Sequence, residues 1–580
     1  MGQVIRLDNE QVLYVPSRDL DAVVEGNEVH FRFQGLSNDP FGSHYALFST
    51  DFQFERQATV LGDGFQMLAQ TTGTIDKPVD IGRCPDNSAS YRLYGSNEPK
   101  RYYNYLVVED SLGYTLFGFT SCRRFAGYFE VREQKGTRTL TAYIDGENTH
   151  PSDWSHSELE SVVVLKGPSL SGLYETFSDC IAKHHPPRAG VDGVAPLGWC
   201  SWYAYYAQVK EQQIRDNVRC MKENIKPLEY VLIDDGYQAF MGDWLSPSKQ
   251  FPSGLASLIE EIKRSGKKPA IWVAPFIAEG NSTIFRQHPD WFVTHDNGQI
   301  MKAEDVTYAG WRCTPWYLLD TTHSDVQDHL THVFKTMREE WGIELFKLDA
   351  NYWGALKGRR WQSGITGVEA YRMGMDAIAQ GAGDAWLLGC NAPMWPSLGM
   401  VDAMRVSDDV ERDPRRFEQI AKETFYRSWQ HRKLWQIDPD CATLVSLPNQ
   451  AAERQAYEFH RDVLLASGGL LLSGDPLPDL TTFAKKTLAK LVMRHNHNQD
   501  AAKFTAFNLH HGFLKLTERN DLHCLFNYHQ TGREVTLTSD YPVYWFDYWS
   551  GEKLTAEPEQ VIEVTLEAGL SSRAIITAPS

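Results

Sequence analysis

The chain has 580 residues, of which 42% are hydrophobic and 23% charged, a composition typical of globular proteins. Its formal net charge of −18 argues against a nucleic-acid or anionic-membrane partner, because both attract basic surfaces. Nine cysteines lie scattered without zinc-type spacing, the amino terminus lacks a signal-peptide layout, and no run is long enough to span a membrane. We therefore expect a cytoplasmic protein; a homo-oligomer is compatible with the sequence.

Residues 1–180 are predicted to form an N-terminal β-sandwich domain. Short runs rich in aromatic and β-branched residues, such as HYALFST, YNYLVVED and ESVVVLKG, alternate with Gly, Asn, Asp and Pro. This alternation is typical of antiparallel sheets packed face to face. A helical pattern, SGLYETFSDCIAKHH, and a linker rich in Pro and Gly follow.

Residues 190–490 are predicted to form a catalytic (β/α)8 TIM barrel. Apolar runs alternate there with helical segments, as in a parallel sheet covered by helices. The periodicity of the apolar residues is equally consistent with an open doubly wound sheet. The eight apolar runs are 196–203, 230–238, 268–276, 345–351, 385–393, 403–409, 434–440 and 468–476.

Residues 500–580 are predicted to form a C-terminal antiparallel β domain. HCLFNYHQ, REVTLTSD, PVYWFDYWSG and VIEVTLEAG have the length and composition of strands. The predicted fold class is therefore a multidomain α/β plus all-β protein, with an N-terminal β-sandwich, a central TIM barrel and a C-terminal antiparallel β-sandwich.

Acidic and aromatic residues follow the apolar runs, at the end of the strands where a barrel carries its active site. One Asp after a strand is more often the N-cap of the next helix, and one Trp in a barrel more often packs in the core. The convergence of many such residues on one rim favours a carbohydrate site, with carboxylates for the hydroxyls and rings for the sugar's C–H face. The residues are Trp202, Asp234, Asp235, Trp272, Asp349, Cys390, Asp408 and Asp409.

Cleavage of a glycosidic bond needs two carboxyl groups, one at the anomeric carbon and one at the leaving oxygen. Asp349 is the predicted nucleophile, because Lys347, two residues earlier on the same face of a strand, can hold its carboxylate ionised. Asp409, four residues after Arg405, is the predicted general acid. Magnesium or calcium binding is a weaker alternative, because Lys347 and Arg405 would compete with the ion for these carboxylates.

Six motifs make the sequence resemble glycoside hydrolase family 36, the retaining α-galactosidases in the clan shared with family 27. They are FKLDAN, IDDGYQ with GDWL, IWVAPF, HPDW, LGCNAP and MRVSDDVERDP, the last being similar to the raffinose-synthase and seed-imbibition branch. The resemblance covers the whole chain in layout and includes an N-terminal β-supersandwich. It implies an exo-acting α-galactosidase that hydrolyses terminal α-galactosyl residues of oligosaccharides through a covalent galactosyl-aspartate intermediate, with no cofactor and no metal.

The resemblance also implies roles for single residues. Asp349 would be the nucleophile and Asp409 the acid/base, although some family members use the position of Asp408 for the latter. Asp234 and Asp235 would accept hydrogen bonds from O4 and O6 of galactose. The same subsite would be lined by Lys347, Arg405, Trp272, Trp202 and Cys390.

Two other functions are consistent with parts of the sequence. A galactosyltransferase of the raffinose-synthase kind would form the same intermediate and pass it to a sugar instead of water. A non-catalytic sugar-binding protein would lack one of the two carboxyls, and both are present. The segment DGFQMLAQ departs from the family pattern, because Met67 and Leu68 stand where a small residue and a Trp are expected, so a changed contact with the substrate is predicted there.

Overall fold

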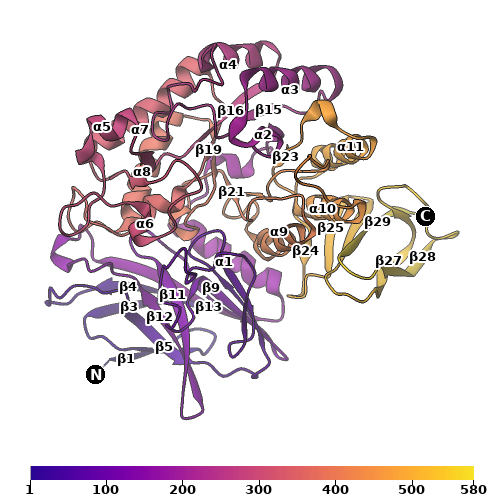
Figure 1. The fold of residues 1–580 in the computed structure, drawn as a ribbon. Helices are drawn as coiled ribbons and strands as arrows, with labels where there is room; N and C mark the ends of the chain where they lie inside the picture. The colour runs from indigo at the N-terminus through magenta and orange to yellow at the C-terminus, as the bar shows by residue number, and fades with distance from the viewer. Residues whose placement is uncertain (1) are drawn as a thin grey trace. The chain divides into compact units, whose positions relative to one another are not determined.

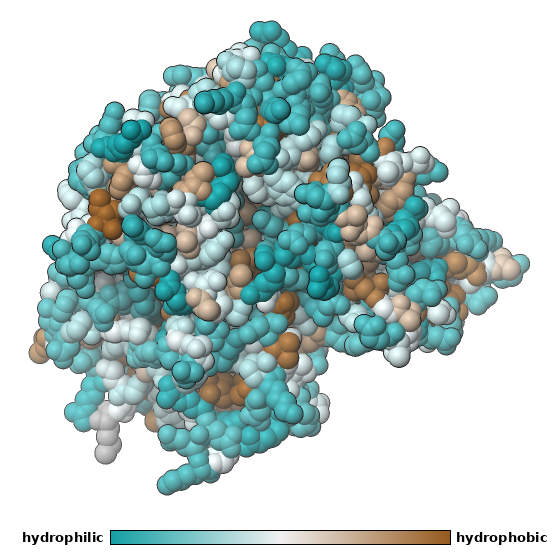
Figure 2. All heavy atoms as spheres, in the orientation of Figure 1, coloured by the Kyte–Doolittle hydropathy of each residue, from teal (hydrophilic) through white to brown (hydrophobic). Residues whose placement is uncertain are grey.

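The computed structural model describes residues 2–580, which separate into two compact units. Among these residues, no helix combines the length and the apolar character that crossing a membrane requires. On the face shown in Figure 2, hydrophobic side chains occur in small separate patches among hydrophilic ones. The first unit comprises Met1–Arg188, Gln238–Lys249 and Trp272–Asp402, and the second comprises Ala189–Tyr237, Gln250–Ile271 and Ala403–Ser580.

The N-terminal part of the first unit is a thirteen-stranded sheet whose strands pair in antiparallel fashion, as predicted (Figure 1). Its main path runs β1-β2-β5-β12-β11-β9-β10-β13-β4-β3, and β6, β7 and β8 branch from β9. The strands are β1 (Gln3–Arg6), β2 (Val12–Val15), β3 (Leu20–Glu25), β4 (Glu28–Phe33), β5 (Tyr45–Asp51), β6 (Thr59–Asp63), β7 (Gln70–Gly73), β8 (Pro78–Asp80), β9 (Tyr102–Asp110), β10 (Gly113–Phe119), β11 (Gly127–Gln134), β12 (Thr137–Ile144) and β13 (Glu158–Gly167).

Helix α1 (Leu170–His184) follows this sheet and confirms the predicted helical segment. It begins at Ser169, whose hydroxyl accepts a hydrogen bond from the Gly172 N–H at 3.2 Å, the usual arrangement of an N-cap. Its apolar side packs on β10 and β13. At Gly118, a Cβ would lie 2.5 Å from the Phe177 ring, so only glycine allows the helix this close approach.

Eight short strands form a barrel-like parallel sheet, and each lies within one of the predicted apolar runs. The sheet order, β22-β21-β20-β19-β16-β15-β14-β23, follows the order of the chain, which excludes a doubly wound sheet. In the second unit, a parallel bridge between Ala442 and Ser473 joins the segment after β22 to β23. The strands are β14 (Leu197–Cys200), β15 (Tyr230–Ile233), β16 (Lys268–Val273), β19 (Leu345–Leu348), β20 (Trp386–Gly389), β21 (Ala403–Arg405), β22 (Gln436–Asp438) and β23 (Leu471–Ser473).

Helices alternate with these strands, as the sequence pattern predicts. Their apolar sides are buried, as in α4, where Leu255, Leu258, Ile259 and Ile262 repeat at helical spacing. The long segment between β16 and β19 contains the two-stranded sheet of β17 (Ile277–Glu279) and β18 (Trp316–Leu318). The helices are α2 (Trp202–Tyr205), α3 (Glu211–Asn224), α4 (Leu255–Arg264), α5 (Thr283–Gln287), α6 (Ala303–Val306), α7 (Ser324–Lys335), α8 (Gly367–Ala382), α9 (Pro414–Arg427), α10 (Arg454–Ser467) and α11 (Thr482–His497).

The C-terminal part of the second unit is an antiparallel six-stranded sheet of order β24-β25-β26-β29-β27-β28, as predicted. Its core packs around Trp545, which is fully buried. The carboxylate of Asp462 on α10 accepts hydrogen bonds from Trp549 and Ser572, which ties the sheet to the helix. The strands are β24 (Lys503–Phe504), β25 (His511–Thr517), β26 (Asn520–Asn527), β27 (Arg533–Asp547), β28 (Glu559–Leu566) and β29 (Ser571–Pro579).

Candidate active site

Three of the predicted acidic residues share one local structure at the carboxyl end of a barrel strand. Each carboxylate accepts a hydrogen bond from the backbone N–H of the next residue, which fixes the orientation of the side chain where the strand ends. The pairs are Asp234 with the N–H of Asp235 at 2.8 Å, Asp349 with that of Ala350 at 2.6 Å, and Asp408 with that of Asp409 at 2.8 Å.

Asp349 follows β19 in the first unit, and its carboxylate is held on both oxygens. Trp272 Nε1 donates to Oδ2 at 2.9 Å, and Asn391 Nδ2 donates to Oδ1 at 2.8 Å, beside the Ala350 N–H. The side chain keeps only a small exposed fraction, since Asp349 is 8% exposed. Three N–H donors on two oxygens leave the carboxylate little freedom to rotate, so they fix its position.

The backbone around Asp349 is held in an uncommon conformation. Ala350 and Asn391 have φ angles of 55° and 41°, in the left-handed region that residues other than glycine seldom adopt. Such strain persists where the surrounding structure over-determines it, and it clusters at functional sites. Here the two turns aim the Ala350 N–H and the Asn391 amide at the same carboxylate oxygen.

The other predicted residues of the first unit, which are Lys347, Cys390 and Trp272, are buried in or directly after barrel strands. Lys347 lies on β19 and is 5% exposed, and Cys390, the residue after β20, is 1% exposed. Trp272, at the end of β16, packs edge-on against Trp244 and Trp311, with ring centroids 5.7 and 6.5 Å away. These rings fix the indole whose N–H reaches Asp349.

In the second unit, Asp234 and Asp235 follow β15 and are both almost completely buried. The Asp234 N–H donates to Ser201 Oγ at 2.9 Å, and Cys200 Sγ lies 3.4 Å from Asp234 Oδ2. The chain leaves the pair through Gly236, whose φ of 126° is a glycine conformation and where a Cβ would lie 2.6 Å from the Ala207 carbonyl. Trp202, on the short helix α2 after β14, is partly exposed and packs edge-on against Tyr206.

Asp409 belongs to an ion-pair group centred on Arg405. Arg405 is fully buried on β21, and its Nη2 donates to Asp409 Oδ1 at 2.8 Å. Its Nη1 lies 3.3 Å from Asp440 Oδ1, and Asp440 Oδ2 in turn accepts a hydrogen bond from the Tyr203 hydroxyl. The Asp409 side chain remains 47% exposed, so its carboxyl is open to solvent while its partner is buried.

Asp408 lies in a different environment from its neighbour. It is 4% exposed, and α9 surrounds its carboxylate, with Gln419 Nε2 at 2.9 Å and Arg416 Nη1 at 3.7 Å from Oδ2. The Asp408 N–H donates to Glu423 Oε1 at 3.2 Å. Burial, and secondly the charge of Asp408, raise the pKa of Glu423 to about 8. The surroundings of Asp408 are therefore those of a carboxylate held within the protein, whereas Asp409 is accessible.

The segment DGFQMLAQ (residues 63–70), which departs from the family pattern, contacts the loop after β20. Gln66 forms a bridge with Pro393, the Met67 N–H donates to the Ala392 carbonyl at 3.3 Å, and the Met394 N–H donates to the Phe65 carbonyl at 2.8 Å. Met67 and Leu68 are buried, at 1% and 6% exposure. The N-terminal sheet region thus supports the loop that carries Asn391, and the predicted change in substrate contact stays a prediction.

Two residues of this arrangement were not among the predicted site residues. Asn391 follows Cys390 at the end of a predicted strand, but its role depends on a left-handed turn that composition does not reveal. Asp440 follows β22, 35 residues after Arg405, and shares that arginine with Asp409. The signal for both was their position at the polar end of an apolar run.

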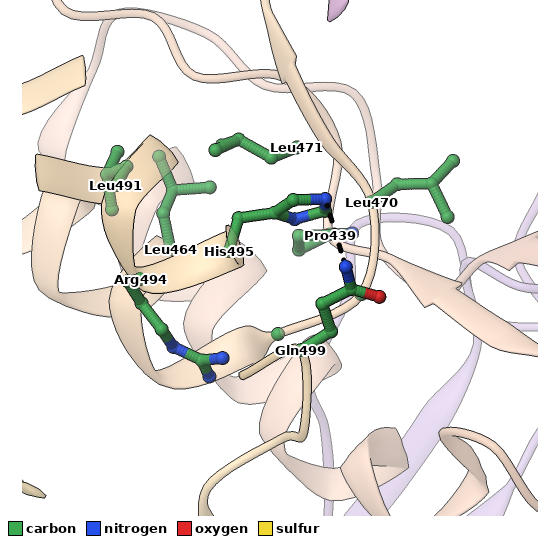
Figure 3. A pocket seen from close by; sticks show the side chains of 10 residues that line it. Pro439, Leu464, Leu470, Leu471, Leu491, Arg494, His495 and Gln499 are labelled. Carbon is green, nitrogen blue, oxygen red and sulfur yellow. Dashed lines mark hydrogen bonds between the residues drawn. The ribbon is translucent and has the colours of Figure 1, made fainter. Parts of the chain in front are cut away.

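A small cavity in the second unit has the wrong dimensions for a sugar (Figure 3). It measures about 20 Å³, which is room for about one water molecule. His495, near the end of α11, and Gln499, two residues after the helix, lie on its wall with His495 Nε2 3.5 Å from Gln499 Nε2. We therefore assign the candidate site to the strand-end carboxylates and not to this cavity.

Comparison with known proteins gives one family match and several relatives. Residues 155–375 match the Melibiase family. Alpha-galactosidase AgaA of Geobacillus stearothermophilus is 25% identical over 199 residues, 33% of this chain and 26% of that protein. Probable alpha-galactosidase G of Aspergillus terreus is 23% identical over 292 residues, 46% of this chain and 38% of that protein. The match therefore spans well under half the length of these curated relatives.

Solved structures of the same class share the fold over most of their length. The alpha-galactosidase TtGalA of Thermus thermophilus has a TM-score of 0.65 at 21% identity, covering 85% of this chain and 95% of that one. The GH36 alpha-galactosidase AgaA of Geobacillus stearothermophilus has a TM-score of 0.65 at 14% identity, covering 98% of this chain and 81% of that one. Residues 155–375 are thus similar to the Melibiase family, and the solved structures show that the chain shares the fold of these two alpha-galactosidases.

Proposed function

We propose that this protein is an α-galactosidase that hydrolyses terminal α-galactosyl residues of oligosaccharides. The observation that carries the proposal is Asp349, a carboxylate after a barrel strand, oriented by donors on both oxygens. The names of the relatives support the reaction class. The substrate class is supported by neighbours solved with p-nitrophenyl α-D-galactopyranoside, stachyose and raffinose.

The proposed mechanism retains the anomeric configuration. Asp349 Oδ attacks the anomeric carbon while Asp409 donates a proton to the leaving oxygen, which gives a β-linked galactosyl ester of Asp349 and the free leaving alcohol. Asp409, now ionised, removes a proton from water as the water attacks the same carbon. The ester breaks, α-galactose leaves and Asp409 regains its proton.

The acid/base role is assigned to Asp409 and not to Asp408 because of their exposure. A group that exchanges protons with a leaving alcohol and with water must reach both, and Asp409 is 47% exposed. Asp408 is 4% exposed and bound by Gln419 and Arg416. Arg405 Nη2 donates to Asp409 Oδ1 at 2.8 Å, which orients the side chain.

Sugar recognition is assigned to Asp234 and Asp235, with Trp202, Trp272, Lys347, Arg405 and Cys390 lining the subsite. Buried acceptors discriminate against a sugar that lacks the matching hydroxyl, because they are then left without a donor. We therefore propose a preference for α-galactosides over α-glucosides. Equal rates on the two p-nitrophenyl glycosides would contradict this assignment.

The test of the reaction is product analysis with raffinose and melibiose as substrates. Free galactose in proportion to substrate consumed is the expected result, whereas longer oligosaccharides would indicate transfer to a sugar. Proton NMR of the first-formed product decides the stereochemistry. α-Galactose must appear before its β-anomer, and the reverse order would overturn the mechanism.

The finer architecture is proposed with the function. We propose an N-terminal β-supersandwich over 1–180, a closed TIM barrel over 190–490 and a C-terminal β-sandwich over 500–580, in a cytoplasmic protein. Limited proteolysis followed by mass spectrometry tests the boundaries, because cleavage should concentrate in the connections that follow α1 and α11, at 186–190 and 498–501. Early cleavage within the barrel strands would contradict these boundaries.

A further inference from the structure

A cluster of potential metal ligands lies in the N-terminal region, on parts of the chain that the proposed reaction does not use. Glu28 and His30 are on β4, two residues apart and therefore on one face of the strand. His184, 156 residues after Glu28, is the last residue of α1. The three residues come together only through the packing of the helix, which explains why no spacing motif marks them.

The ligand atoms of this cluster converge. His184 Nε2 lies 3.1 Å from Glu28 Oε2, and His30 Nε2 lies 3.5 Å from Glu28 Oε1. All three ligand atoms fall within 4.8 Å of one another. Glu25, the last residue of β3, adds a carboxylate oxygen 3.4 Å from His30 Nε2.

These separations match the geometry of a zinc site. Ligand atoms about 2.0–2.1 Å from a tetrahedral ion lie about 3.4 Å from each other. Two imidazoles with carboxylates are a donor set that zinc accepts.

We propose that Glu28, His30 and His184 bind a divalent transition-metal ion, with zinc as the expected ion and Glu25 as the fourth ligand. The side chains are partly enclosed, at 6% exposure for Glu28, 12% for His184 and 32% for His30. The ion would tie β4 to the end of α1. Because it binds the folded chain, it would stabilise this region.

Groups around the cluster determine how tightly the cluster binds zinc. His30 Nδ1 lies 2.9 Å from Ser161 Oγ, a contact that orients the ring with Nε2 toward Glu28. At His184, Arg123 Nη2 lies 3.2 Å from Nδ1, so the proton of the neutral ring is on Nε2. Zinc binding through Nε2 moves that proton to Nδ1, and the exposed Arg123 must then leave the ring. Arg123 therefore opposes binding, by its hydrogen bond and by its charge.

The first test is zinc binding by the full chain after EDTA treatment, with zinc alone as the probe. Isothermal titration calorimetry in a thiol-reducing buffer is expected to show one site that is at least about 100-fold weaker in the double variant His30→Gln/His184→Gln, which loses both imidazole ligands. Glutamine retains an N–H donor for Glu28, and circular dichroism checks the fold. Equal binding by the wild-type chain and the double variant would overturn the proposal.

Two variants complete the test. His511→Gln/His523→Gln is the matched control, because these histidines form a pair with His511 Nε2 2.9 Å from His523 Nδ1 but belong to no three-ligand cluster among the described residues. It is expected to keep the zinc site, and its loss would overturn the assignment to β4 and α1. Arg123→Ala is expected to bind zinc at least threefold more tightly, and an affinity that does not rise would overturn coordination through His184 Nε2.

Discussion

The surroundings of Asp349 and Asp409 differ in the way their proposed roles require. Asp349 is held by N–H donors from Trp272, Asn391 and the backbone, and it is 8% exposed. Asp409 pairs with Arg405, and its side chain is 47% exposed. A nucleophile must point at one carbon, because a small misplacement lowers the reaction rate strongly. A proton-transfer group must instead reach two oxygens in turn, that of the leaving alcohol and that of water.

The comparison also shows two kinds of partner for a carboxylate. Neutral N–H donors fix the position of Asp349. A buried arginine compensates the charge of Asp409, and Asp440 shares that arginine at 3.3 Å. Substitution of each carboxylate and of its partners should therefore give different kinetic signatures.

The largest expected effect is that of Asp349→Ala. Removal of the nucleophile should lower kcat by at least ~10⁴-fold on every α-galactoside, because the bond-forming group is lost. With an activated aryl galactoside, azide should enter the vacated position and give β-galactosyl azide, identified by proton NMR. Ordinary turnover in this variant would contradict the proposed mechanism.

Asp409→Ala should slow the enzyme by a factor that depends on the leaving group of the substrate. Loss of a general acid costs about 10²–10⁴-fold on raffinose, whose leaving alcohol needs a proton, and much less in the first step on a dinitrophenyl galactoside. Azide should release the intermediate from the opposite face as α-galactosyl azide. Rate constants across aryl galactosides of graded leaving-group pKa measure the effect. Asp408→Ala is the control; if it shows this pattern instead, the assignment is wrong by one residue.

Substitution of single donors to Asp349 should have a moderate effect. Trp272→Phe removes the indole N–H and retains an aromatic ring, and Asn391→Ala removes the amide. Loss of a hydrogen bond to a charged group costs about 1.5–3 kcal/mol, so kcat should fall about 10- to 150-fold. Steady-state kinetics on p-nitrophenyl α-galactoside check this, with Trp244→Phe as the aromatic control. An unchanged kcat in both donor variants would show that these bonds do not orient the nucleophile.

The smallest effect concerns stability near Asp408. The pKa of Glu423 is raised to about 8 by burial and the Asp408 charge, so its stabilising contribution is fully present below about pH 4.5 and is lost as pH rises through about 8. Glu423→Gln should remove this loss. Relative to the wild type, the free energy of unfolding of the variant should be about 1–2 kcal/mol more favourable at pH 8.5 than at pH 5. Urea unfolding at the two pH values measures it. Glu418→Gln on the same helix is the control, and the same pH response in both variants would refute the assignment.

Much of the fold could be predicted because buried parallel strands are continuous apolar runs. All eight barrel strands lie within the predicted runs, and Asp349 was placed at a strand end from the change in polarity alone. The contacts that orient it could not be predicted, since the Asn391 amide reaches Asp349 only through a left-handed turn. The link between Arg405 and Asp440 depends on neighbouring strands whose register is set by tertiary packing.

The contact between Phe65–Ala69 and the loop after β20 has a consequence for protein engineering by domain exchange. Trp395 in that loop also donates to the Phe119 carbonyl of β10 at 2.7 Å, and the Gly367 N–H at the start of α8 donates to Glu147 at 2.9 Å. The N-terminal sheet region thus supports the turn that carries Asn391 and the beginning of a barrel helix. A protein engineer who exchanged this sheet for that of a distant relative would also be replacing part of the support of the nucleophile. An exchange of the sheet alone would therefore also have to preserve its contacts with the loop after β20 and with the start of α8.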